Sequence, residues 1–325
     1  MNSAKSTFLI LFLLINALSC DSSSDEINNS TTDDYNLLVV DDLGKVYEIG
    51  NNTGNIEQTG TINKQIDGTF LGLGTITSTE DKIYAIEYFY DPGPVNNLLI
   101  FDKQTGTTEI IRLEIPENLI GDENAIAGLT TYGSKLIAIL TEDLYLNNNI
   151  KNMVSIDLET YQIEDLGITF YENGITSMEY TNDKVYISTI NEGFLEINLN
   201  TSSVNNLQFS DTIINGGKLA VIDNNRIALM QFDHNNNITN DFKPVELDIT
   251  NQTFTDKSNN NLFGYATPSG TSIYKNNEYI NLFSSADLEI YYGILKCNFE
   301  TNTIDMVTIN STTINRNMVI IGTVD

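Results

Sequence analysis

Oxygen-bearing side chains recur in this sequence at positions that suit the binding of a hard cation. An Asp or Asn stands shortly before the apolar run that opens each of several similar units: Asp67, Asn124, Asn173 and Asn215. If these units surround an axis, their carboxylate and amide oxygens form a ring that suits Ca²⁺ or the hydroxyls of a sugar. Asn-Gly and Asp-Gly pairs also simply turn a chain into a strand, and this second interpretation stays open.

A second group of oxygens lies in the segment DHNNNITND. Asp233, Asn235, Asn237 and Asp241 occupy its first, third, fifth and ninth positions, which resembles the first part of a calcium-binding loop. Ile238 stands where such a loop needs glycine, so a solvated Asn-rich loop is the alternative. Ca²⁺ is the one cofactor that the sequence indicates.

Tyrosines gather in segments that we expect to form long loops. A tyrosine presents a flat ring and a hydroxyl, which suit contact with a sugar ring or with a partner protein. Some of these rings pack in the core instead, because aromatic residues are common in strands. The candidate ligand-binding residues are Tyr88, Tyr90, Tyr145, Tyr291 and Tyr292.

The composition excludes several classes of function. Lys and Arg total 16 against 44 Asp and Glu, which gives a formal net charge of −28. Nucleic-acid binding needs clustered Lys and Arg, so we expect no nucleic-acid partner. The chain has one histidine, and it has no GxSxG, P-loop or GxGxxG sequence. The sequence therefore favours a binding protein over an enzyme.

The first 19 residues have the features of an export signal. Lys5 precedes the eight-residue apolar run FLILFLLI, which is too short to span a membrane and suits a signal peptide. The following NALSC, which ends at Cys20, resembles the lipobox of bacterial lipoproteins. That resemblance implies cleavage before Cys20 and attachment of acyl chains, palmitate among them, to this residue. Ordinary secretory cleavage with an incidental Cys20 is the alternative.

Residues 20–34 form an acidic, polar segment that we expect to be a flexible tether. DSSSDEINNSTTDD has too little apolar surface to fold. A cysteine followed at once by Ser and acidic residues resembles the export signal of Bacteroidota surface lipoproteins. The resemblance implies an outer-membrane lipoprotein exposed on the cell surface and bound to the membrane by its N-terminal lipid.

Residues 35–325 contain several copies of one β unit, which follow one another along the chain. Short apolar strands alternate with clusters of Asn, Asp, Gly and Thr, and no sustained helical periodicity occurs. A five-residue turn recurs every 41 to 55 residues, and each turn is preceded by a strand pair with its own tight turn. The unit predicts four antiparallel strands, which is typical of a β-propeller blade. The turns open at Gly50, Asp102, Asp157, Asn198, Asp248 and Asn298.

The six repeats predict an all-β, six-bladed propeller that is closed by its ends. The first repeat supplies only three strands, and the C-terminal NRNMVIIGTVD supplies one strand without a partner. We expect this last strand to complete the first blade, because closure removes an exposed edge. By pattern, the domain resembles TolB-like six-bladed propellers generally.

Strand direction places the longer connections together on one face, where we expect the binding site. The expected function is that of a monomeric surface lipoprotein whose propeller face binds a glycan or an envelope protein without catalysis. The alternative is a calcium-dependent lactonase or esterase. In propellers of the gluconolactonase type, Glu, Asn and Asp hold a catalytic metal in a similar place. That resemblance implies Asp67, Asn124, Asn173 and Asn215 as metal ligands and Asp122 or Glu172 as the general base.

Overall fold

The chain divides into two units, Met1–Asp34 and Tyr35–Asp325, and all the strands belong to the second. In this computed structural model the described residues are 34–88, 96–119, 125–141, 150–171, 175–189, 193–209, 219–233, 241–258, 263–264, 266–285, 293–310 and 318–324. Within these ranges the secondary structure is strand and turn, with no helix.

The strands follow one another along the chain in the expected repeats. The first half contains β1 (Asn36–Asp41), β2 (Lys45–Gly50), β3 (Ile56–Thr61), β4 (Phe70–Ser78), β5 (Lys82–Tyr88), β6 (Asn97–Asp102), β7 (Thr108–Arg112), β8 (Ala125–Tyr132), β9 (Lys135–Thr141), β10 (Ile150–Asp157), β11 (Ile163–Tyr171) and β12 (Ile175–Thr181). The second half contains β13 (Lys184–Thr189), β14 (Phe194–Asn198), β15 (Ser203–Leu207), β16 (Ala220–Val221), β17 (Arg226–Asp233), β18 (Asp241–Asp248), β19 (Thr253–Asp256), β20 (Phe263–Gly264), β21 (Ala266–Lys275), β22 (Glu278–Ser285), β23 (Gly293–Asn298), β24 (Thr303–Thr308) and β25 (Met318–Val324).

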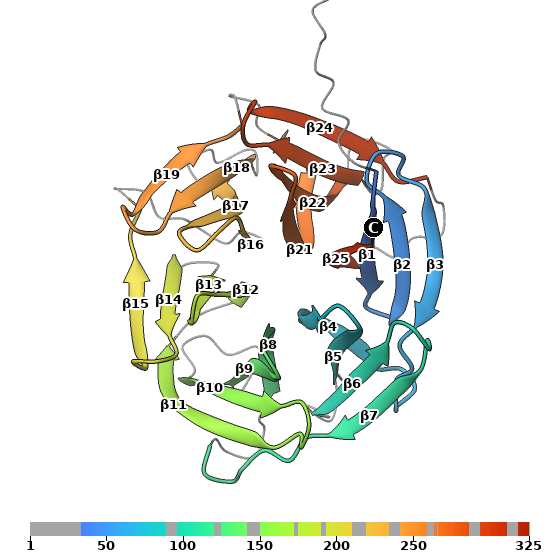
Figure 1. The fold of residues 1–325 in the computed structure, drawn as a ribbon, viewed down its shortest axis with the longest axis vertical. Coiled ribbons are helices and arrows are strands. Elements are labelled where there is room, and N and C mark those ends of the chain that lie inside the picture. Colours follow the sequence, from blue (N-terminus) through green and yellow to red (C-terminus); the bar gives the residue numbers. More distant parts are fainter. Residues whose placement is uncertain are drawn as a thin grey trace, which may run out of the picture. The chain divides into compact units, whose positions relative to one another are not determined.

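Six antiparallel sheets surround a central axis, and this arrangement confirms the predicted six-bladed propeller (Figure 1). Each sheet has four strands, and the short strand β20 adds to the fifth blade by pairing with β18. The innermost strands are β25, β4, β8, β12, β16 and β21.

The first blade is closed by the C-terminal strand, as the sequence predicts. Strand β25 pairs with β1 in an antiparallel register that matches Val40 with Val319 and Asn36 with Val324. Met318 and Ile320 pack against the blade formed by β21–β24, whereas Val319 packs toward the blade of β4–β7. The last strand therefore joins both neighbouring interfaces as well as its own sheet.

The apolar strands are buried on both faces because each sheet lies between two others. Among the described residues, six buried clusters correspond to the six interfaces between blades. In β1, Leu37 and Val39 join the cluster on one side, and Leu38 and Val40 join the cluster on the other. This double burial explains the consecutive apolar positions that the sequence shows.

The six repeated turns share one backbone design. In five of them the opening Asp or Asn accepts backbone N–H groups through Oδ1; Asp102, for example, accepts from Gln104 at 3.0 Å and from Thr105 at 2.8 Å. These bonds lower the pKa of Asp102, since they favour its charged form. The fifth residue always has a left-handed φ, in the order Gly54, Gly106, Tyr161, Ser202, Gln252 and Asn302.

A second repeated hydrogen bond shows which turns share a face. In each blade the residue after the turn opener donates its N–H to a carbonyl where the second strand begins, for example Lys103 to Asp81 at 2.9 Å. The first blade has no tight turn there, and Asn51 donates to Tyr35 at 3.0 Å instead. We call this side the short-turn face, and the opposite side, where the other connections emerge, the long-loop face. Tyr35 therefore lies at the short-turn face.

The left-handed turn position gives a direct stability test. Gly106→Ala should lower the free energy of unfolding by about 1 kcal/mol, because φ at this position is +66°. Backbone strain is the whole of this effect, since no atom lies within 4 Å of the added Cβ. Ser202→Gly should raise it by up to about 1 kcal/mol, because relief of strain outweighs the entropy that glycine adds to the unfolded chain. Urea unfolding of both variants measures these changes. A stabilised Gly106→Ala variant would contradict this description of the turn.

Candidate functional site

Most residues predicted to bind a ligand or a metal lie outside the described residues, so these assignments stay predictions. They are Cys20, Tyr90, Asn124, Asn173, Asn215, Tyr145, Asn235, Asn237, Tyr291 and Tyr292.

Three predicted residues lie at the long-loop ends of strands, where the backbone alone is described. Tyr88 is the last residue of β5. Asp233 and Asp241 are opposite one another in the register of β17 and β18. The expected calcium-type loop therefore connects two paired strands, whereas a loop of the EF-hand type connects two helices.

Asp67 is exposed on the loop that leads into the innermost strand β4. A fully buried carboxylate, Glu87, holds this loop in place by accepting from Ile66 N at 2.9 Å and from Thr69 Oγ1 at 2.7 Å. Asn97 Nδ2 donates to the second oxygen of Glu87 at 2.8 Å. Glu87 thus positions the only described member of the predicted oxygen ring. The calcium-dependent alternative stays a prediction.

Large hydrophobic side chains are exposed mainly on the long-loop face. Of the five such residues in the described part of the chain, four lie at this end of their blades: Leu43, Ile66, Ile150 and Tyr171. Ile150 and Tyr171 are cross-strand partners at the ends of β10 and β11, and Tyr171 is 62% exposed. The fifth, Met306, lies in the outer strand β24.

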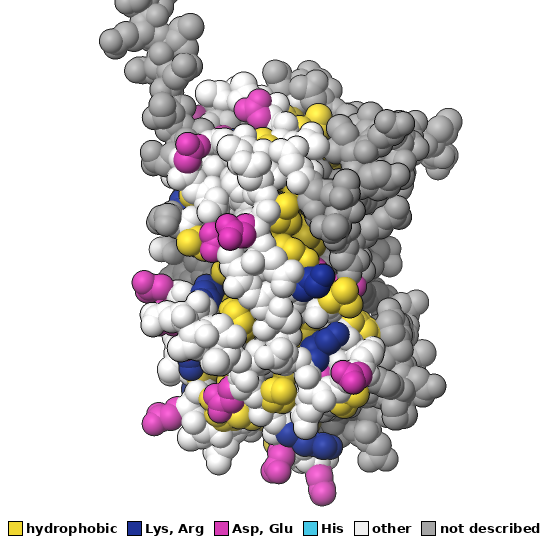
Figure 2. Space-filling view, turned by 90° about the vertical axis from the view of Figure 1, so that its right-hand side faces the viewer, with side chains coloured by type: hydrophobic (Ala, Val, Ile, Leu, Met, Phe, Trp, Pro, Cys, Tyr) yellow, Lys and Arg dark blue, Asp and Glu magenta, His cyan; other side chains and the backbone are white. Residues whose placement is uncertain are grey.

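Tyr171 is the exposed aromatic residue that sequence reasoning missed. The sequence did predict exposed tyrosines on this face, and strand alternation could have identified this one, because Ile168 and Phe170 are buried whereas Thr169 and Tyr171 are exposed. Elsewhere, on the side of the ring around β2 and β3, hydrophobic side chains form small separate patches among polar ones (Figure 2). The pair Ile150 and Tyr171 therefore places two exposed large hydrophobic side chains next to each other on the long-loop face.

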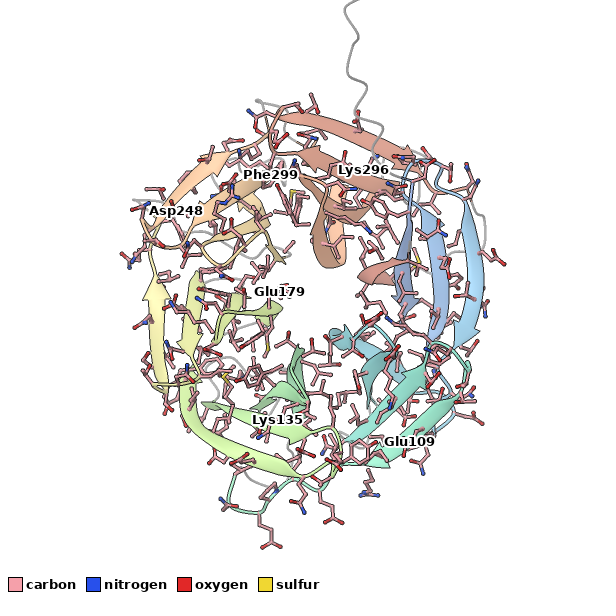
Figure 3. The ribbon with its side chains drawn as sticks, viewed as in Figure 1. Glu109, Lys135, Glu179, Asp248, Lys296 and Phe299 are labelled. Atoms are coloured by element: carbon pink, nitrogen blue, oxygen red, sulfur yellow. The ribbon has the colours of Figure 1, made fainter. Side chains whose placement is uncertain are left out.

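A cavity of about 310 Å³ lies on the central axis at the short-turn end of the ring. All six innermost strands contribute two or three residues each to its lining, and in five of the strands these residues lie close to the short-turn end. Glu179 from β12 is the one acidic residue among the described lining residues, which include no Lys, Arg or His. Figure 3 shows Glu179 at the central opening, in contrast to Glu109 on the outer rim.

Bulges bring the innermost strands into the centre. The registers of β4, β8, β12, β21 and β25 against their neighbours each contain an irregularity. The largest is in β4, where Leu71 and Ile76 are five residues apart but face Glu87 and Ala85. Bulges redirect side chains and are frequent beside functional sites. They explain why the contents of the cavity do not follow from strand alternation alone.

Burial raises the pKa of the Glu179 carboxyl to about 8, and no charged or hydrogen-bonding group offsets this effect. The side chain still borders the cavity, so its accessible surface is intermediate although protein surrounds it closely. At neutral pH the carboxyl is therefore mainly protonated, which makes it a donor as well as an acceptor. A perturbed carboxyl in a cavity is the usual physical mark of a functional site.

A groove of about 510 Å³ on the short-turn face separates the outer parts of the fourth and fifth blades. Its wall includes Lys184 and Glu196, which form an ion pair at 2.7 Å. The Tyr186 hydroxyl also donates to Glu196, at 3.2 Å. Since these charges neutralise each other, the groove presents mainly amides, those of Asn182, Asn205, Asn206, Asn224, Asn225 and Gln252. The sequence analysis placed the binding site on the opposite face and did not predict this groove.

The fold places the chain among six-bladed β-propellers. No protein-family model matches the chain, and no curated protein shows significant sequence similarity to it. Within the described residues, no three His, Cys, Asp or Glu side chains form a group suited to a metal ion. None of the described segments is a helix long and apolar enough to cross a membrane.

Glu179 should make the free energy of unfolding depend on pH, and the variant Glu179→Gln isolates this contribution. Its pKa is higher in the folded state than in the unfolded chain, so stability is lost as pH rises from about 4.5 through about 8. The loss is at most about 1.4 kcal/mol per pH unit in this window. Glu179→Gln removes the titration, so its stability relative to the natural protein should increase from pH 5 to pH 8. Parallel thermal unfolding curves measure the difference; a constant difference would show that Glu179 is ionised in the fold.

Proposed function

We propose that this protein is a membrane-anchored lipoprotein of the cell envelope whose long-loop face binds a glycan or a protein partner without catalysis. The observation that carries the proposal is the concentration of exposed hydrophobic residues on that face, with Tyr171 and Ile150 side by side. Exposed aromatic residues at the rim of a rigid scaffold suit recognition of either partner class.

Tyr35 lies at the short-turn face, where its carbonyl accepts a hydrogen bond from Asn51. The first strand of the propeller therefore begins at the end of the ring opposite the exposed hydrophobic residues of the long-loop face. The acidic tether and strongly negative domain also repel an anionic membrane surface.

Binding should depend on Tyr171 and Ile150 but not on a matched residue elsewhere. Replacing both with Ser should weaken binding of the purified protein to isolated cell envelopes at least tenfold, because it removes the exposed apolar contact. Met306→Ser changes a similarly exposed side chain on the outer rim and should leave binding unchanged. Envelope binding is measured by co-sedimentation with fluorescently labelled protein.

The same assay distinguishes the two partner classes. Periodate treatment of the envelopes destroys glycans, and protease treatment destroys proteins, so the treatment that abolishes binding identifies the class. Equal binding by the natural protein and the double variant would contradict the assignment of this face. Variants of Tyr90, Tyr145 and Tyr291 extend the test to the predicted loops.

The anchor has a separate test at Cys20. In cells that express the natural protein, labelled palmitate should be incorporated and the protein should fractionate with membranes. Cys20→Ala should abolish both, because the residue that receives the acyl chains is gone. Incorporation of palmitate by Cys20→Ala would contradict the anchor without bearing on the binding face.

A further inference from the structure

Glu179 is an exception to the chemistry of its own repeat. Counting from the short turn, its position in β12 is opposite Tyr186 of β13. The equivalent positions of the other innermost strands carry no ionisable group. They are Thr77, Thr130, Ala220, Ile273 and Gly322. The carboxyl is therefore specific to one blade, although the fold needs no acid there.

An uncompensated carboxyl at this place is costly in its charged form. The protein packed around the carboxyl disfavours its charged form, and a cation beside it would stabilise that form. The other titratable residues that line the cavity are Tyr180 of β12 and Tyr274 of β21. Strands β4, β8, β16 and β25 contribute neither acid nor base to the described lining. A cation from solution is thus the partner that the site lacks.

The residues that line the cavity favour a small monovalent organic cation over a divalent metal ion. One carboxylate matches one positive charge, whereas a divalent ion needs several oxygen ligands of high charge. The hydroxyls of Thr77 and Thr131 can accept N–H groups, and the partly exposed Val221 and Ile321 offer apolar surface to carbon atoms. The volume of about 310 Å³ lies at the lower end of the range for small-molecule sites. The net charge of −28 attracts cations to the protein as a whole.

We propose that the central cavity binds a small organic ammonium ion, with its nitrogen on the Glu179 carboxylate and its carbon atoms against Val221 and Ile321. The site is distinct from the long-loop face, and its ligand does not depend on the partner of that face. Binding ionises Glu179, so the proton of the carboxyl is released to the solvent as the cation enters. Affinity should therefore rise with pH until the free carboxyl is already ionised.

Titration calorimetry of the purified protein with choline tests the site, because the charge of choline does not change with pH. At pH 7, the heat measured in two buffers of different ionisation enthalpy should report release of nearly one proton per bound choline. The apparent affinity should increase about tenfold from pH 6 to pH 7, since only the ionised fraction binds, and should level off above pH 8. Ethanolammonium at pH 7 provides a second probe that carries N–H donors.

Two controls make the result decisive. Glu179→Gln should weaken binding at least tenfold and abolish proton release, whereas Glu109→Gln, on the outer rim, should retain both. Sodium chloride at equal ionic strength should give no comparable heat or thermal stabilisation. Failure of both probes to bind, binding without proton release, or an equal response to sodium would overturn the proposal. The pH dependence of the natural protein provides the test even if Glu179→Gln does not fold.

Discussion

Burial of every sheet on both faces is the constraint on which this structure depends. A four-stranded sheet with apolar residues at consecutive positions has no face for water, so each blade needs a neighbour on either side. Only a closed ring gives all six blades two neighbours, and strand β25 completes it by pairing with β1. Met318, Val319 and Ile320 divide between two interfaces, so the last strand completes the packing as well as the hydrogen bonding. The same closure creates a central axis, and with it the cavity.

The two ends of this axis differ because the turns differ. At the short-turn face, a repeated hydrogen bond ties the start of the second strand to the turn between the third and fourth, so this side varies little between blades. The connections at the other side vary in length, and the exposed hydrophobic residues of the described chain lie mainly there. The repeated hydrogen bonds and most of the exposed hydrophobic residues are thereby separated at opposite ends of the ring. Tyr35 lies at the short-turn end.

The sequence predicted the architecture because its signals are local and repeated. Turn openers such as Asp102 accept their own backbone N–H groups, and consecutive apolar residues such as Leu37 and Leu38 point to opposite interfaces, so both can be read without tertiary knowledge. The cavity could not be predicted from such local signals. Glu179 follows a methionine in an ordinary strand, and its environment arises from five other blades. Tyr171, by contrast, alternates with the buried Phe170, so the strand periodicity indicates an outward side chain.

The lone carboxyl of the cavity is difficult to explain as a structural element. The repeat itself does not require an acid at this position, because the equivalents of Glu179 in the other five blades are not ionisable. Glu87 shows what a structural buried carboxylate requires in this protein, namely three donors from neighbouring segments that hold a loop. Glu179 has no such set, and burial alone determines its pKa. A group that destabilises the empty fold above its unfolded pKa is best understood through the state in which its charge is matched, and the axis of the ring is the place where a small cation reaches it.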